Sequence, residues 1–172
     1  MQNTSKGNDN ERELRGALGR FPTGVAIATA LAENGQPVGM TINSLASISL
    51  APALIAWSID HGSASYAIFV NAKRFAVTVL AESQADLAMR FATRGADKFR
   101  DLEIDRSGAP VIPNACAWFR CETCRTVVLG DHTMLIGKII EFDKSPLQPL
   151  VFIGGQFQRA GQSLAETTRA AA

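Results

Sequence analysis

The sequence predicts a mainly β protein with short helices, arranged as a closed or partly closed barrel. About seven segments alternate apolar and polar residues with the two-residue period of strands, and helices do not alternate regularly with them. The pair Asn34-Gly35, a strong hairpin signal, separates two of these segments. A doubly wound dinucleotide-binding sheet is therefore not expected.

The chain has 172 residues, enough for one domain, and its 47% hydrophobic content is sufficient for a substantial core. We expect residues 1–9 to be a disordered N-terminus, 10–160 a single domain and 161–172 a flexible C-terminal tail. The net charge of +1, without a basic run, predicts no nucleic-acid partner. Neither a spanning segment nor a signal peptide is visible, so we expect no membrane association and a cytoplasmic location.

The individual elements are predicted from periodicity and from turn residues. Helices are expected over 11–19, 66–73 and 84–93, with Ser63 or Ser65 capping the second. Residues 94–113 are expected to be mostly loop, and a turn over 130–132 is expected to join two long strands. The predicted strands cover 25–31, 38–42, 44–50, 54–59, 75–79, 116–129, 133–142 and 151–153.

Three closely spaced cysteines, Cys116, Cys121 and Cys124, raise the question of metal or redox chemistry. Their odd number argues against a disulfide framework, and the Cys-x-x-Cys pair lacks further ligands for zinc. Strand alternation puts residues three apart on opposite faces, which suits neither role. We interpret them as buried structural cysteines and expect no metal site, with redox or metal chemistry as the alternative.

No nucleotide-binding, hydrolase, kinase or zinc-protease motif is present, so a bound cofactor would have to supply the reactive atoms. Two stretches suit a phosphorylated cofactor. Residues 39–47 are rich in hydroxyl and amide side chains, and 60–66 combine small residues with a helix start that suits phosphate. A polar strand edge and an ordinary helix cap are the simpler interpretations of these stretches.

Four blocks of sequence, in order and with consistent spacing, extend from about Phe21 to Phe157. The first block comprises Phe21-Pro22-Thr23-Gly24-Val25, Gly39-Met40-Thr41-Ile42-Asn43-Ser44-Leu45 and the Ser-Leu-x-Pro-x-Leu run over 49–54. The second is Arg74-Phe75-Ala76-Val77-Thr78-Val79-Leu80 with Gln84 and Leu87-Ala88, and the third is Gly130-Asp131-His132-Thr133 with Gly137-Lys138-Ile139. The fourth is Phe152-Ile153-Gly154-Gly155-Gln156-Phe157. Together these blocks resemble the short-chain NAD(P)H:flavin reductases.

The resemblance implies an FMN-binding split β-barrel of Greek-key type that forms a homodimer and binds FMN or FAD near the subunit interface. It implies an enzyme that takes hydride from NADH or NADPH and passes reduced flavin to a partner monooxygenase. The chain departs from the family pattern by lacking an arginine near Ile153 or Gly154 and by having Phe157 where a tyrosine is usual. The missing arginine leaves the choice between NADH and NADPH open, and the choice between FMN and FAD is open because both share the flavin and the first phosphate.

The resemblance also implies a set of site residues. His132 would face the nicotinamide as the catalytic residue, because a histidine proton is tunable near neutral pH; the alternative is a turn residue bonded to Asp131. His61 is expected to be a loop residue. The implied cofactor-binding residues are Met40, Thr41, Ile42, Asn43, Ser44 and Ser47 at the isoalloxazine and ribityl, Ile59, Asp60, Ser63, Ser65 and Tyr66 along the chain and phosphate, Phe91 and Ala92 closing the flavin site, and Gly154, Gly155, Gln156 and Phe157 at the nicotinamide.

Two other classes of protein remain open. A non-catalytic flavin- or haem-binding barrel could carry electrons or sense redox state, and it would not turn over NADH. A relative of pyridoxamine-phosphate oxidase would share the barrel, but it would need a basic cluster for its substrate phosphate, and no such cluster is found in the sequence.

Overall fold

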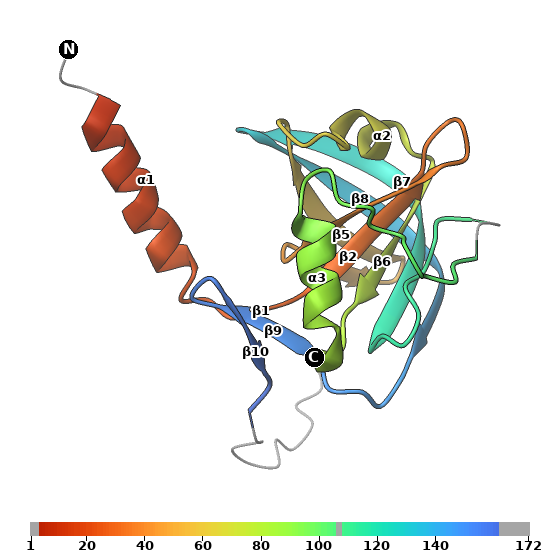
Figure 1. Ribbon diagram of the computed structural model, residues 1–172. Helices are drawn as coiled ribbons and strands as arrows, with labels where there is room; N and C mark the ends of the chain where they lie inside the picture. Colours follow the sequence, from red (N-terminus) through yellow and green to blue (C-terminus); the bar gives the residue numbers. More distant parts are fainter. Residues whose placement is uncertain (1–3, 106–107, 162–172) are drawn as a thin grey trace.

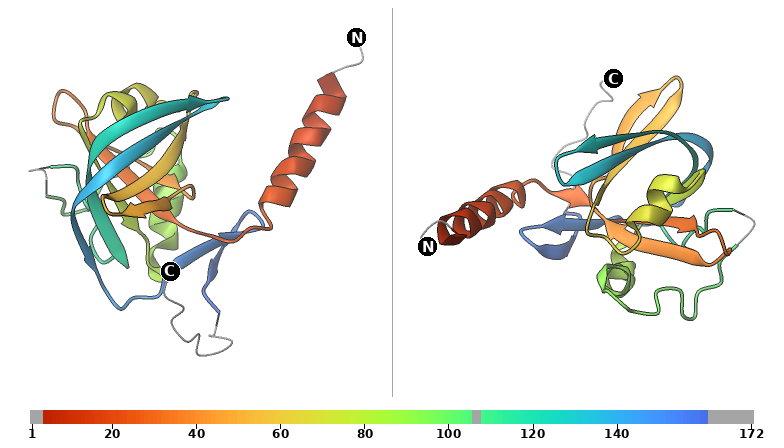
Figure 2. Two further views of the ribbon diagram at one scale, coloured as in Figure 1. Left: turned by 180° about the vertical axis from the view of Figure 1, so that it is seen from behind. Right: turned by 90° about the horizontal axis from the view of Figure 1, so that it is seen from above.

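The computed structural model describes residues 4–105 and 108–161. Their strands form two antiparallel sheets (Figure 1). The larger sheet has seven strands in the order β3-β2-β6-β7-β8-β5-β4, and it curls into an open barrel (Figure 2). Its strands are β2 (Ala26–Leu31), β3 (Pro37–Ile42), β4 (Ala46–Leu50), β5 (Ala53–Asp60), β6 (Arg74–Val79), β7 (Ala117–Leu129) and β8 (His132–Lys144).

Small residues on β2 make room for the aromatic core of the barrel. Ala26, Ala28 and Ala30 are buried on one face of β2, as strand alternation requires. The space they leave is filled by Trp57 on β5, which meets Phe69 and Phe75 edge-on at centroid distances of 5.0 and 6.0 Å. The predicted barrel is thus confirmed, with its core inside the larger sheet.

The hairpin predicted at Asn34-Gly35 is confirmed. β2 and β3 pair from Ala26↔Ile42 to Leu31↔Pro37, and Gly35 takes a positive φ of 75°, which glycine adopts without strain. The Asn34 side chain also accepts a hydrogen bond from the backbone of Gln36 at 3.0 Å. This hairpin makes β3 an edge strand, which matters for the site described below.

A second sheet of three short strands lies beside the barrel, and the sequence predicted only one of them. β1 (Thr23–Gly24) and β10 (Gln156–Arg159) flank β9 (Leu150–Ile153). β1 and β2 are almost continuous in the chain, so this sheet is attached directly to the barrel through Val25. The backbone of Val25 bonds to Leu150 on one side and to Leu80 on the other.

A second core packs between the barrel and helix α3 (Ala85–Ala92), which follows the short 3-10 helix η1 (Glu82–Gln84). α3 lies over the β3 side of the barrel (Figure 1), and Phe91 on it is fully buried. The predicted helix over 84–93 is therefore confirmed with slightly shorter limits. Gly39 on β3 faces this helix, and a Cβ there would lie 2.6 Å from the Phe91 ring.

Helix α1 (Thr4–Leu18) projects away from the barrel (Figure 2). It begins well before the predicted residue 11 and therefore corrects the disorder expected for residues 4–9. A helix that has formed gains one backbone hydrogen bond for each residue added to it, so it can extend into a polar segment. Such an extension has no apolar period, and the sequence prediction, which relied on that period, did not detect it. Residues 1–3 and the tail after Gly161 lie outside the described residues.

Helix α2 (Tyr66–Asn71) ends two residues earlier than predicted, because Ala72 is extended. Ser65 occupies the N-cap position, but its side chain makes no capping hydrogen bond. The hydroxyl of Ser63 instead accepts a bond from the Ser65 backbone at 3.3 Å, forming a turn before the helix. The predicted side-chain cap is therefore wrong. No helix within the described part of the chain is long and apolar enough to cross a membrane.

Candidate functional site

A groove of about 350 Å³ runs along edge strand β3, between the start of α2 and the end of α3. The structure brings seven residues of the predicted flavin site together there, although they come from three separate parts of the sequence. The remaining lining residues are Gly62 and Ala64, which lie within the predicted stretch 60–66, and Arg94 and Lys98, which were not predicted. The seven predicted residues that line the groove are Met40, Thr41, Asp60, Ser63, Ser65, Phe91 and Ala92.

The walls of the groove are joined by hydrogen bonds between β3 and its neighbours. The Thr41 hydroxyl donates to the Ala88 carbonyl of α3 at 2.6 Å, which fixes the helix to the strand. On the other wall the Ser63 hydroxyl approaches the Met40 sulfur at 4.0 Å, and the Asp60 carboxylate accepts from the Gly62 backbone at 2.6 Å. The tight turn over 60–65 is therefore held by hydrogen bonds of its own.

The floor of the groove is aromatic. Phe91 meets Phe99 edge-on at 5.0 Å, and both rings pack against Gly39, where a side chain would collide with them. This packing places Lys98, the residue before Phe99, at the groove, and its ammonium donates to the Gly39 carbonyl at 2.9 Å. Burial lowers the pKa of Lys98 below its ordinary value.

A second groove has a volume of about 550 Å³, and residues 43–46, which follow the Met40 and Thr41 of the first groove in the sequence, form part of its lining. The predicted residues Asn43 and Ser44 line it, together with Thr23, whose hydroxyl oxygen is buried without a hydrogen-bond partner. Ser44 is already used internally, because its hydroxyl accepts from the Ser58 backbone at 3.1 Å. The amide of Asn43 is exposed, and it has no hydrogen-bond partner within 4–105 and 108–161.

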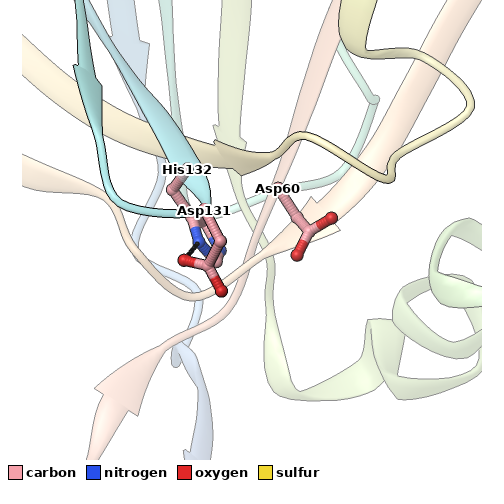
Figure 3. Close-up of side chains that lie close together, drawn as sticks. All are labelled: Asp60, Asp131 and His132. Carbon is pink, nitrogen blue, oxygen red and sulfur yellow. Dashed lines mark hydrogen bonds and ion pairs between the residues drawn. The ribbon is translucent and has the colours of Figure 1, made fainter.

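His132 lies at the turn between β7 and β8, directly opposite Asp60 of β5 in the strand register. Figure 3 shows the His132 ring beside the Asp131 carboxylate, and Nδ1 lies 2.7 Å from it. The hydrogen bond from His132 is the largest cause that lowers the pKa of Asp131 below its ordinary value. With Nδ1 held in this way, the other ring nitrogen has no partner in the described chain and can meet a ligand.

Asp60, Asp131 and His132 also form a group whose possible metal-ligand atoms all lie within 4.8 Å of one another (Figure 3). The sequence predicted no metal site. Both carboxylates are exposed. Because exposed acidic groups are common without a metal, we interpret the group as the charged surroundings of His132.

His61 is a structural loop residue, in agreement with its predicted role. Its ring nitrogen Nε2 lies 3.1 Å from the hydroxyl of buried Thr133, and the Tyr66 hydroxyl lies 2.9 Å from the same oxygen. The two rings also meet edge-on at 5.1 Å. Tyr66 was expected along the flavin chain, but its hydroxyl is bound inside the protein.

Several predicted site residues lie elsewhere. The side chains of Ile42 and Ile59 are 5% and 0% exposed and belong to the barrel core, so only their backbones could contact a ligand. Ser47 is exposed on edge strand β4 and lines neither groove. Predicted nicotinamide residues Gly154, Gly155, Gln156 and Phe157 form the turn and start of β10 in the smaller sheet, and they also line neither groove.

The cysteines are only partly as predicted. Cys121 is buried in the barrel core, and burial raises its pKa to about 12. Cys116 is half-buried, and burial raises its pKa as well. Cys124 is exposed, which contradicts the prediction that all three are buried. The difference follows from the pairing of β7 with β8: Cys121 pairs with Ile139, whereas Cys124 is the unpaired residue at a bulge between Thr123 and Arg125.

Arg94 and Lys98 could not be assigned from the sequence, because they lie in a loop without a motif. The available signal was a pair of basic residues four apart that directly follows a helix with a buried phenylalanine. Only the fold shows that this loop returns to β3 and faces the turn over 60–65.

The sequence of the chain matches the family model described as "Flavin reductase like domain" over residues 18–161. The chain belongs to this family. The match includes both grooves, the His132 turn and the smaller sheet, so the predicted resemblance is confirmed.

Curated relatives support the same family. The chain is 43% identical over 155 residues to "FMN reductase (NADH) SmoA" of Agrobacterium fabrum, covering 89% of this chain and 88% of the relative. It is 41% identical over 148 residues to the reductase component of flavin-dependent trigonelline monooxygenase from Acinetobacter baylyi. That alignment covers 85% of this chain but 48% of the relative, so the chain spans about half the length of that protein.

Solved structures show that the fold is the flavin reductase split barrel. The NADH:FAD oxidoreductase SgcE6 of Streptomyces globisporus, in complex with NAD and FAD fragments, superimposes with a TM-score of 0.84 at 32% identity. The match covers 91% of this chain and 96% of that one. The styrene monooxygenase flavin reductase of Pseudomonas putida S12 has a TM-score of 0.80 at 33% identity, covering 88% and 99% of the two chains.

Proposed function

We propose that this chain is an NADH-dependent flavin reductase, which transfers hydride from the reduced nicotinamide to FMN or FAD and supplies reduced flavin to a separate monooxygenase component. One observation carries the proposal: the family match extends over both grooves and the His132 turn. The names of the relatives support the activity, since one is an FMN reductase that uses NADH and another the reductase component of a monooxygenase.

The donor set of the grooves fits a flavin. A flavin has a flat apolar ring with polar edges, a hydroxylated chain and a phosphate. The second groove offers the unpartnered amide of Asn43 beside apolar Leu45 and Val79. The first offers hydroxyl groups at Ser63 and Ser65 and two cations. The ring would thus lie in the second groove and the chain and phosphate in the first.

When bound, the flavin supplies the ring that accepts hydride, so the protein needs no nucleophile of its own. The residues of this chain orient the flavin and the nicotinamide and exclude water from between them. Asn43 binds the polar edge of the ring, and the turn at Ser63 and Ser65 binds the chain and phosphate. His132, oriented by Asp131, positions the nicotinamide through its free ring nitrogen.

We further propose that the protein is a homodimer. Edge strand β4 exposes Ile48 and Leu50, which are 52% and 89% accessible, and β8 exposes Ile140 and Phe142. Apolar side chains on an open sheet edge favour pairing with another chain. A second copy is also the simplest source of residues that would close the two open grooves.

The activity is tested by steady-state oxidation of NADH and of NADPH with FMN, FAD and riboflavin in turn. The proposal predicts turnover that depends on added flavin and is faster with NADH. If the protein binds flavin but does not oxidise either nicotinamide, it is a non-catalytic flavin-binding barrel, and the proposed function is wrong.

A further inference from the structure

Thr133 follows His132 directly on β8, and its side chain is buried, with 2% of the residue exposed. Successive residues of a strand point to opposite faces of the sheet. The Thr133 side chain therefore enters the barrel, whereas the half-buried His132 side chain points outward. The two residues share one short stretch of backbone, so a contact that holds Thr133 also restricts the movement of His132.

The Thr133 hydroxyl bonds two side chains from the segment that leads into α2. The Tyr66 hydroxyl lies 2.9 Å from it, and the ring nitrogen Nε2 of His61 lies 3.1 Å from it. A hydroxyl has one proton to donate and two lone pairs that accept, so it can satisfy both partners at once. The rings of His61 and Tyr66 meet edge-on at 5.1 Å, which holds the two partners together around the hydroxyl.

His61 also holds the residue on the other side of His132. Its backbone N–H donates to the Asp131 carbonyl at 3.0 Å, and His132 itself pairs with Asp60 in the strand register. His61 thus bonds the residue before His132 through its backbone and the residue after it, Thr133, through its side chain. The backbone of His132 is therefore held from both sides by one neighbouring residue.

The His132 ring has one contact of its own, the Asp131 carboxylate 2.7 Å from Nδ1 (Figure 3). The Asp131 side chain is 87% exposed, and an exposed charged contact contributes little to holding a side chain in place. The direction of the ring therefore depends on the backbone that Thr133 anchors. Hydride transfer is sensitive to such positioning, since a misplacement of about 1 Å can reduce the rate roughly a hundred-fold.

We propose that Thr133 is a positioning residue for the nicotinamide: bonded to His61 and Tyr66 inside the barrel, it fixes the backbone from which His132 meets the nicotinamide. This inference rests on the proposed function, because it assumes that His132 positions the nicotinamide. Thr133, His61 and Tyr66 do not touch the nicotinamide themselves and act through His132.

The test is stopped-flow reduction of FMN by NADH without oxygen, at protein concentrations that bind all of the FMN, so that a change in flavin affinity does not affect the rates. Thr133→Val keeps the shape of the side chain but removes its hydroxyl. It should lower the second-order rate constant for reduction by NADH about two- to tenfold, the effect of losing one hydrogen bond. His61→Leu should lower it as well. Thr133→Ser and His61→Gln each keep a polar atom for the bond and should retain most of the wild-type rate.

Thr78→Val is the matched control. Thr78 is also a buried threonine of the barrel, its hydroxyl accepts a hydrogen bond from the Ile112 backbone at 3.2 Å, and it lines neither groove. Thr78→Val should lower the Tm, as Thr133→Val should, but leave the rate of flavin reduction unchanged. If both variants slow the reduction equally, the Thr133 hydroxyl only stabilises the fold and the proposal is overturned.

Combining Thr133→Val with His132→Ala shows whether Thr133 acts through His132. If it does, Thr133→Val has no further effect once the His132 side chain is removed, whereas independent, multiplying effects would overturn the proposal. Wild-type reduction rates in Thr133→Val or in His61→Leu would overturn it too, and His61→Leu, at an exposed position, supplies this test if Thr133→Val does not fold. In each of these cases the wild type still reduces flavin, whereas failure of the proposed function would abolish reduction by the wild type itself.

Discussion

Replacing Gly39 with alanine would insert a methyl group into the packing that supports the first groove. The new Cβ would lie 2.6 Å from Phe91 Cε1 and 3.2 Å from Phe99 Cζ. Ordinary carbon–carbon contacts are about 3.5–4.0 Å, so one of the rings would have to move by roughly 1 Å. The shorter of these contacts is to Phe91, so that ring has to move, and its edge-on partner Phe99 and the adjacent Lys98 are expected to shift with it.

The cost of such overpacking is about 1–3 kcal/mol. For a protein of this size, each kcal/mol corresponds to roughly 2–4 °C, so Gly39→Ala should lower the Tm by about 2–12 °C. Because Lys98 shifts with Phe99, FMN binding should weaken as well. Thermal unfolding and a fluorescence titration with FMN measure the two effects separately.

Gly16→Ala is the matched control. Gly16 lies within exposed helix α1, and a Cβ there would meet nothing within 4 Å. Alanine is favoured over glycine inside a helix by roughly 0.5–1 kcal/mol, so this variant should be as stable as the wild type or slightly more stable. A wild-type Tm for Gly39→Ala would show that the β3–α3 packing is looser than described, and the reasoning would fail.

Four further outcomes are expected. His132→Ala should raise the KM for NADH or lower kcat while leaving FMN affinity unchanged, and unchanged flavin reduction in stopped flow would make His132 a turn residue. At about pH 8, a thiol reagent should label Cys124 rapidly and Cys121 slowly, since burial raises the pKa of Cys121 to about 12. Rapid labelling of both thiols would show that Cys121 is not buried in the core. Because this pKa is raised on folding, the stability that Cys121 contributes should be lost as the pH rises from about 9 toward 12. Light scattering should report a dimer, and a monomer at micromolar concentration would contradict the proposed assembly.

The features that could be predicted from the sequence are those with a local signal. The hairpin at Asn34-Gly35 follows from the conformation that glycine permits, and the strands of the barrel follow from their two-residue period. β1 and β10 were missed because they are short and mostly polar, whereas the equally short β9 is wholly apolar. Their strand conformation comes from pairing with β9, a contact distant in sequence.

Part of the candidate site was also predicted from local sequence signals. The polar run containing Thr41 and Asn43 and the turn containing Ser63 are visible as local composition. Whether a side chain faces the groove depends on the barrel: Thr41 lines it, whereas neighbouring Ile42 is buried in the core. Lys98 reaches the groove only because Phe99 packs against Phe91 across a glycine, which no local pattern reveals.

The most direct test of the central claim is to mix the purified protein with FMN and NADH in the absence of oxygen and to follow the visible absorbance of the flavin. The account predicts that FMN is bleached at a rate proportional to the protein concentration, with one NADH consumed for each flavin reduced. If the absorbance stays unchanged although FMN is bound, the chain is not a flavin reductase.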